Sequence, residues 1–196
     1  MIIDMRIEKD ITDEEIYGLE IESIDNIIIK NVTFENCIFK NINFENIVFE
    51  NVDLVKVTFK NCDLSNKIFD EKYLSKTTFD NCKMTGVSFV DSYLTDIKFS
   101  ECLMNYINFS SSKLKNINFD NCDLTEASFI FSKMKKMVFE NVKLTGAEFR
   151  NTSLKDVDLS SSNIDQAKFD LFSLKGMIID VTQASSLVYM LGVNIK

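Results

Sequence analysis

The feature that most constrains this chain is a large apolar residue at every fifth position. In the segment NVTFENCIFKNINFENIVFENVDL, Phe34, Phe39, Phe44 and Phe49 are each five residues apart, and Leu54 continues the row. An α-helix returns to one face after about 3.6 residues, and a β-strand changes face at every residue. Neither a single helix nor a single strand can therefore bury the whole row.

The row continues without an insertion over most of the chain. From Ile24 to Ile179, every position whose number ends in 4 or 9 is Phe, Leu, Ile or Met. Two positions after the large residue Asn recurs, and Gly86, Gly146 and Gly176 occupy the same slot. Asn and Gly tolerate positive φ angles better than other residues. Each five-residue unit is therefore predicted to be a short extended piece that ends in a corner.

A second period, of twenty residues, indicates how many corners make up one coil. Stacking the chain every twenty residues gives one Phe column from Phe39 to Phe139 and another from Phe49 to Phe169, with Leu and Met columns between them. Large and smaller residues then alternate within each layer, as a close-packed interior requires. We predict an all-β fold, a four-sided parallel β-helix of about eight coils between residues 22 and 181.

Composition argues against several classes of function. The sequence contains no His, which is the usual general base and a common metal ligand, so most hydrolytic chemistry is disfavoured. The net charge of −8 argues against a general nucleic-acid binder and allows a partner that itself prefers anions. We expect no cofactor and no enzymatic activity.

Cysteine usage and hydropathy bear on location. No stretch approaches the roughly 18 unbroken apolar residues of a membrane span, and no signal peptide is evident, so we expect no membrane partner. Five cysteines without a zinc or disulfide framework fit a reducing compartment, and a cytoplasmic protein is expected. Cys62, Cys82, Cys102 and Cys122 are twenty residues apart and are predicted to stack as buried core. A single-file column supplies no converging ligands, so no metal site is expected.

The first 21 residues carry only a weak version of the repeat and are predicted to form an N-terminal cap. Thr12 and Glu15 have the spacing of a capping box, which favours a short helical turn. A simple polar lid over the apolar end of the coil is the alternative.

The C-terminal tail, residues 182–196, leaves the repeat. Asp180 or Thr182 can cap a helix that reaches Leu191, with Gly192 at its C′ position. Such an apolar cap can also pair with its copy in a second chain, giving a two-fold homodimer. The residues predicted for that interface are Leu187, Met190, Leu191 and Val193.

Two lysines break the inward pattern. Lys67 and Lys72 occupy slots that are otherwise small or apolar. Because burying an unpaired ammonium is expensive, we predict a local bulge or an outward turn at these positions. A paired, functional lysine is the alternative.

The repeat units match a known consensus. NCDLS, NVDLV, NCKMT, NVKLT and DVDLS are close to the unit A(D/N)LXX, and the chain resembles the pentapeptide-repeat family over most of its length. This resemblance implies a right-handed, quadrilateral parallel β-helix. The tail is similar to that of Qnr- and MfpA-type members, whose C-terminal helices form dimers.

The outward residues are expected to sort by wall. The wall centred on Leu114 and Leu154 gathers Lys113, Lys115, Lys133, Lys135, Lys136, Lys155 and Lys175. Two further walls carry the acidic candidates for partner binding, with an apolar strip of Val90, Ile130, Phe131 and Leu171 on the second. The acidic candidates are Asp80, Glu101, Asp120, Glu140 and Asp158 on one wall, and Asp91 and Glu148 on the other.

Three hypotheses of function follow. The resemblance to Qnr and MfpA implies a DNA mimic that binds a type II topoisomerase, DNA gyrase or topoisomerase IV, and protects it from quinolones. Carboxylates at repeat spacing would then imitate phosphates. The alternative is a structural or protein-interaction scaffold with another partner. An enzyme is the third and is disfavoured by the missing His.

Overall fold

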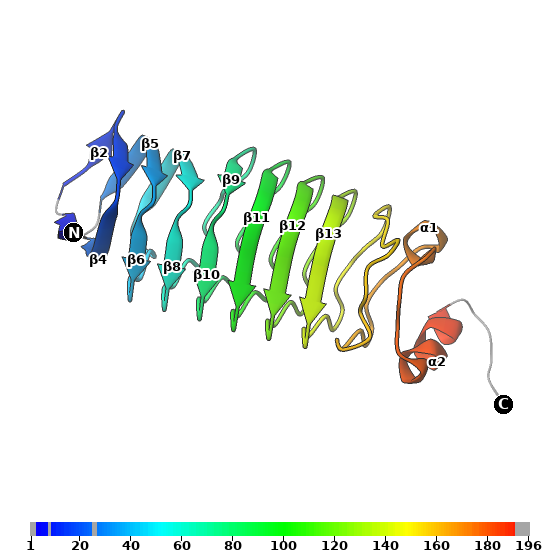
Figure 1. Cartoon of the computed structure of the whole chain (residues 1–196). Coiled ribbons are helices and arrows are strands. Elements are labelled where there is room, and N and C mark those ends of the chain that lie inside the picture. The colour runs from blue at the N-terminus through cyan, green and yellow to red at the C-terminus, as the bar shows by residue number, and fades with distance from the viewer. Residues whose placement is uncertain (1–2, 8, 25–26, 191–196) are drawn as a thin grey trace.

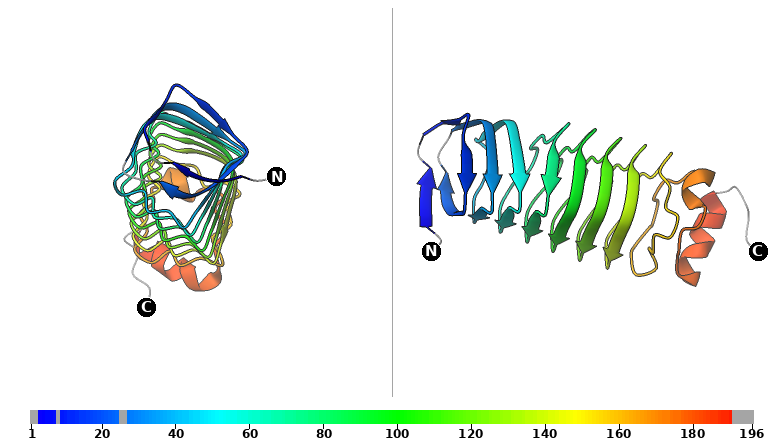
Figure 2. Two further views of the ribbon diagram at one scale, coloured as in Figure 1. Left: turned by 90° about the vertical axis from the view of Figure 1, so that its left-hand side faces the viewer. Right: turned by 45° about the horizontal axis from the view of Figure 1, so that its top comes forward.

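The computed structural model describes residues 3–7, 9–24 and 27–190. Its coils stack along one axis into a rod, with the two termini at opposite ends (Figure 1). Seen along the axis, the coils superimpose as a four-sided tube (Figure 2). The prediction of an all-β, four-sided parallel solenoid is therefore confirmed.

The strands pair in parallel with the strands one coil away. From β10 to β13 the register offset is twenty residues, so that Phe79 pairs with Phe99 and Phe99 with Phe119. The strands are β1 (Ile3–Ile7), β2 (Ile11–Thr12), β3 (Glu15–Tyr17), β4 (Leu19–Ile24), β5 (Ile28–Glu35), β6 (Ile38–Lys40), β7 (Val48–Val55), β8 (Thr58–Lys60), β9 (Tyr73–Ser75), β10 (Thr78–Asp80), β11 (Tyr93–Ser100), β12 (Lys113–Asp120) and β13 (Lys133–Glu140). The helices are α1 (Leu171–Leu174) and α2 (Val181–Met190).

The four walls differ in how their backbones pair. We name them by the inward column each contains: wall A holds Leu114, wall B Phe119, wall C Leu124 and wall D Phe129, all buried. The long strands β11, β12 and β13 each cover walls A and B. Walls C and D are built in this region from turns and single β-bridges. Walls B and D lie opposite each other across the tube.

Phenylalanine rings fill the centre of the tube. On wall B the rings of Phe99 and Phe119 stack with centroids 5.0 Å apart, and on wall D those of Phe109 and Phe129 stack at 5.2 Å. Phe109 also meets Phe119 edge to face at 6.1 Å, so the opposite walls touch. Stacked and edge-to-face pairs are the favoured geometries for aromatic rings. The fifth residue of each unit therefore points inward, as predicted.

Asparagine holds many of the corners. Asn41, Asn61 and Asn81 have φ angles of 56°, 53° and 49°, in the left-handed region that Asn tolerates. Their side chains also form a ladder along the rod, because the Asn61 amide donates to Asn41 at 3.1 Å and that of Asn81 to Asn61 at 2.9 Å. At Gly86, where φ is 69°, a Cβ would lie 2.6 Å from the Asn66 side chain, so any other residue there would require that side chain to move.

The N-terminal segment differs from the prediction. Around Thr12 and Glu15 the structure has β2 and β3, both paired in parallel with β5, instead of a helical turn. Ile11, Ile16 and Ile21 are themselves five residues apart and buried. They pack as a further coil with an offset of its own, so the segment is neither a helix nor a polar lid.

The solenoid has about six turns, fewer than the eight or so expected. The strand ladder ends at Glu140 in β13. Beyond it the chain still stacks, as the rings of Phe149 and Phe169 show with centroids 5.4 Å apart, but it does so through turns and isolated bridges.

Asp180 caps the C-terminal helix α2. Its carboxylate accepts a hydrogen bond from the Thr182 N–H at 2.8 Å, and its own N–H donates to the Gln183 side chain at 2.7 Å. Gln183 also donates to the carbonyls of Leu159 at 3.0 Å and Ser162 at 2.6 Å, which fixes the helix across the end of the tube. The predicted cap is therefore confirmed at Asp180.

The predicted helix end at Leu191 and Gly192 lies outside the described residues. The short helix α1 was not predicted. Asp170 caps it by accepting from the Ser173 N–H at 2.8 Å.

The two inward lysines turn outward without a bulge. The Lys67 ammonium donates to the carbonyls of Glu45 at 3.0 Å and Ile47 at 2.8 Å, one coil away. Lys72 reaches the Asn51 side chain at 2.9 Å. The backbone carbonyls of both lysines keep their hydrogen bonds to the next coil. Each long side chain thus brings its ammonium group to the surface of the tube. This costs less free energy than shifting the backbone out of register.

Removing one central ring tests the packing. Replacing Phe109 by Ala is expected to lower the free energy of unfolding by about 3–5 kcal/mol, because the ring contacts four others inside the tube. Phe131, which is 60% exposed, provides the matched control. Its replacement by Ala is expected to cost less than about 1 kcal/mol in urea unfolding. Equal losses for the two variants would contradict this packing.

Lys67 is expected to make the free energy of unfolding depend on pH in the alkaline range. Burial lowers the pKa of its ammonium below the ordinary value of 10.5. The unfolded chain therefore holds this proton more tightly than the folded one. The stability of the wild type relative to Lys67→Met should then rise with pH from the lowered pKa up to about 10.5, and stay constant below that window. Urea unfolding of both proteins across this range measures the difference, and a flat difference throughout would refute the effect.

Candidate interaction surfaces

The predicted acidic residues of wall B form part of one column along the rod. Lys60, Asp80, Ser100, Asp120 and Glu140 follow one another in register, one per coil. Asp80 lies 3.7 Å from the Lys60 ammonium, so its charge is partly neutralised. Asp120 and Glu140 are direct neighbours of like charge. Acidity on wall B therefore gathers toward the C-terminal half.

Two further candidates extend this acidic region. Glu101 is exposed at the corner between walls B and C, with a φ of 54°. Asp158 is exposed on wall B, and hydrogen bonds from the side chain and N–H of Ser160 lower the pKa of its carboxyl. We call Glu101, Asp120, Glu140 and Asp158 the acidic patch.

The remaining two candidates lie on the opposite wall. Asp91 is exposed at a corner of wall D. Glu148 forms an ion pair with Arg150, and its side chain is only 18% exposed. The structure thus splits the seven predicted residues between two opposite walls. Only those of the acidic patch form a continuous surface.

Ion pairs between coils were not predicted. On wall C, Lys83 lies 3.0 Å from Asp63, and Lys143 lies 3.2 Å from Asp123. Each pair joins residues twenty apart, so opposite charges at that spacing were the sequence signal that could have found them. The same aspartates also accept N–H bonds from the residue two positions on, at 2.9 Å for Asp63 and 3.0 Å for Asp123. This Asx turn explains the Asp or Asn of the repeat unit.

Wall A is basic, as predicted. Lys113 pairs in register with Lys133, and Lys115 with Lys135. The Lys113 ammonium lies 5.7 Å from the centroid of the Tyr93 ring. All the predicted members of this wall are exposed, and within the described part of the chain none of them forms an ion pair. They are Lys113, Lys115, Lys133, Lys135, Lys136, Lys155 and Lys175.

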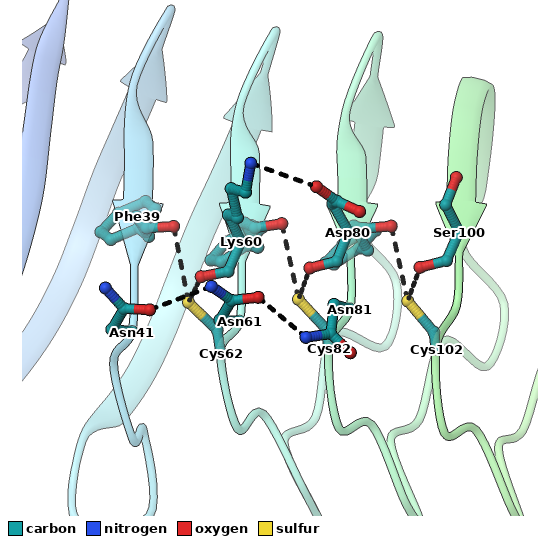
Figure 3. A network of polar contacts seen from close by, with 12 residues as sticks. Phe39, Asn41, Lys60, Asn61, Cys62, Asp80, Asn81, Cys82, Ser100 and Cys102 are labelled. Carbon is teal, nitrogen blue, oxygen red and sulfur yellow. Dashed lines mark hydrogen bonds and ion pairs between the residues drawn. The ribbon is translucent and has the colours of Figure 1, made fainter.

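The cysteine column is core, as predicted. Figure 3 shows the thiols of Cys62, Cys82 and Cys102 side by side in successive coils, and Cys82 donates to the Phe59 carbonyl at 3.5 Å. The contact with the following thiol lowers the pKa of Cys82 and of Cys102, but the contact with the preceding thiol and burial outweigh it and raise both to about 12. Such thiols are protonated at neutral pH and unreactive. Among the residues the structure describes, no cluster suited to a metal ion occurs.

Inward hydroxyl groups form a similar ladder at the start of wall A. Ser92 donates to the Phe69 carbonyl and Ser132 to the Phe109 carbonyl, each at 2.7 Å. Both residues are buried. Their hydroxyl groups satisfy backbone acceptors of the preceding coil and are not placed as nucleophiles.

The structure describes only some of the residues predicted for the dimer interface. Leu187 is partly buried against the core of its own chain, so α2 acts as a lid on the tube. Met190 is the last residue of α2, but the structure does not describe its side chain. Leu191 and Val193 lie outside the described residues. Of the helices that the structure describes, none has the length and apolar character of a membrane span.

Comparison with known proteins bears on the fold. A trypsin-treated variant of QnrB1, a plasmid-mediated fluoroquinolone resistance protein, has 22% identity to this chain and a TM-score of 0.52, over 97% of this chain and 99% of that one. HetL, a pentapeptide-repeat protein involved in heterocyst differentiation regulation in the cyanobacterium Nostoc, has 12% identity and a TM-score of 0.44, over 88% and 87%. No curated protein matches the sequence.

Family models identify the repeat directly. A model described as a pentapeptide repeat region matches residues 52–129, and one described as pentapeptide repeats (8 copies) matches residues 28–66 and 138–176. These ranges cover the coils whose inward columns and Asn corners are described above. The chain therefore belongs to the pentapeptide-repeat family.

Proposed function

We propose that this protein is a non-catalytic binding rod whose acidic patch engages the DNA-binding surface of a type II topoisomerase, in the manner of a DNA mimic. The observation that carries the proposal is the stacking of Asp120 on Glu140, with Asp158 on the same wall and Glu101 at its corner with wall C. None of these four carboxylates is in an ion pair with another described residue. They present a row of fixed negative charge.

The geometry of the patch suits a surface that binds DNA. Neighbouring coils lie about 4.8 Å apart, so Asp120 and Glu140 place two carboxylates in line along the rod, at a spacing of the same order as the roughly 3.4 Å between phosphates along the axis of one DNA strand. The backbone that carries Asp120 and Glu140 is already fixed in β12 and β13, which lowers the entropic cost of binding. The fold shared with QnrB1 supports the choice of gyrase and topoisomerase IV as the first partners to test.

The test compares two double variants of equal net charge. Asp120→Asn with Glu140→Gln removes the centre of the patch. Asp63→Asn with Asp123→Asn removes two carboxylates of wall C that are already ion-paired. We expect the first variant to bind gyrase or topoisomerase IV about tenfold more weakly than the wild type, and to lose its effect on supercoiling with a quinolone present. The second should behave as the wild type.

A wild type that neither binds these enzymes nor changes supercoiling would refute topoisomerase binding. The alternative, an interaction scaffold for another protein, predicts that negative outcome. It would then rest on the apolar strip of wall D rather than on the acidic patch.

We also propose that two chains associate through the C-terminal tail, using Leu187, Met190, Leu191 and Val193. The position of α2 across one end of the rod supports this arrangement, because it places Leu187 and the tail that follows α2 at that end instead of along a wall. Sedimentation is expected to show a dimer of the wild type and a monomer for Met190→Asp with Leu191→Asp. Val181→Asp, at an 82% exposed position at the start of α2, should remain dimeric. A monomeric wild type would exclude the tail as an interface.

A further inference from the structure

Wall A carries a row of lysines that the proposed function does not use. Lys115 and Lys135 are in register on neighbouring strands, and Lys155 follows one coil later. Lys175 comes next, beside Gly176, which packs against the Lys155 side chain. Lys113 and Lys133 form a parallel second row. The result is an array of ammonium groups that begins on strands β12 and β13 and continues over the turns at Lys155 and Lys175.

This array is costly without a counterpart. Like charges that face each other on neighbouring strands destabilise a sheet. Elsewhere the chain relieves its lysines with acids one coil away, as for Lys83 with Asp63 and Lys143 with Asp123. On wall A, Lys113 and Lys115 instead face Lys133 and Lys135. The carboxylate of Asp156 shares a hollow with Lys135, Lys136 and Lys155, but the lysines of this wall outnumber it. An excess of positive charge is therefore left for a partner to neutralise.

Exposed apolar side chains border the same wall. Phe131 stands at the corner between walls D and A and is 60% exposed, with a φ of 58° that a bulky residue rarely adopts. Phe172 is 61% exposed, and together with Phe131, Lys133 and Met134 it lines one shallow hollow. Leu171, in the same short helix, is 75% exposed. Wall A thus combines a basic centre with an apolar edge.

We propose that wall A docks on the surface of an anionic lipid bilayer. All the lysines lie on one side of the rod, so they can reach one plane of headgroups at once, and flexible lysine side chains suit diffuse phosphate and carboxylate charges. Phe131, Leu171 and Phe172 would enter the interface beside them. The net charge of −8 resides on the other walls, so an anionic surface repels those walls and orients the rod with wall A toward the lipid.

This contact needs no spanning helix, and it revises the expectation that no membrane partner exists. A single-stranded nucleic acid is the competing polyanion. It calls for a groove along its backbone and for aromatic rings among the charges. Here the exposed phenylalanines stand at the edge of the wall. The exposed rings of Tyr73 and Tyr93 stack on each other before the first lysine of their column, Lys113, and so lie at one end of the lysine row instead of between the lysines.

Flotation of the full chain with vesicles tests the charge of the wall. Phosphatidylcholine vesicles with about 30% phosphatidylserine should bind the protein at low salt, and vesicles of phosphatidylcholine alone should not. The triple variant Lys115→Gln, Lys135→Gln, Lys155→Gln is expected to bind on the order of 100-fold more weakly. Lys60→Gln, Lys83→Gln, Lys143→Gln removes the same charge from walls B and C and should bind as the wild type.

A second pair of variants tests the apolar edge. Phe131→Asn is expected to weaken vesicle binding several-fold at constant charge. Tyr106→Asn is its control, because Tyr106 is another exposed aromatic residue at a positive-φ corner, between walls C and D, and Asn tolerates that conformation. Circular dichroism checks that each variant is folded. Asp120→Asn with Glu140→Gln should keep full vesicle binding, which separates this inference from topoisomerase binding.

Three results would overturn the inference. The first is equal weakening by the two triple variants, which would indicate an effect of net charge alone. The second is binding to neutral vesicles as strong as to anionic ones. The third is retention of a single-stranded oligonucleotide by wall A without any binding to phosphatidylserine vesicles, which would assign the wall to nucleic acid.

Discussion

Stacking of phenylalanine rings along the axis is the interaction on which the rest of this structure depends. Successive rings on wall B lie 5.0 Å apart, close to the spacing of hydrogen-bonded strands, so ring packing and backbone pairing require the same rise per coil. The edge-to-face contact of Phe109 with Phe119 joins the opposite walls. These contacts fix the twenty-residue register, and the register in turn places every outward side chain in a row along the rod.

The repeat could be predicted from sequence because Phe occupies inward positions in nearly every coil. The N-terminal coil escaped prediction because Ile11, Ile16 and Ile21 keep the five-residue step in a different phase. Lys67 showed that an inward slot fixes the backbone but not the end of a long side chain. For the surface, the sequence predicted which wall each charged residue lies on, but not which charges pair with each other. Glu148 is not a free carboxylate because Arg150 lies beside it, and pairing of this kind depends on side-chain geometry.

Charge on this rod is separated by wall although the same strands carry it. In β12 and β13 the first residues contribute lysines to wall A and the last contribute Asp120 and Glu140 to wall B. A corner with positive φ at Asn116 or Lys136 turns the chain between the two. Opposite charges a few residues apart thus face in different directions. One protein can in this way present two surfaces of opposite sign to two different partners.

The constant register also has a consequence for how such a rod can change length. Every coil ends where the next begins, with the same corner and the same inward columns, as the pairing of Phe99 with Phe119 and of Phe119 with Phe139 illustrates. Duplication or loss of one complete coil would leave each remaining ring with an equivalent neighbour. The lysine and carboxylate rows would each gain or lose one position together. The length of the rod can therefore change by one coil at a time while its cross-section stays the same.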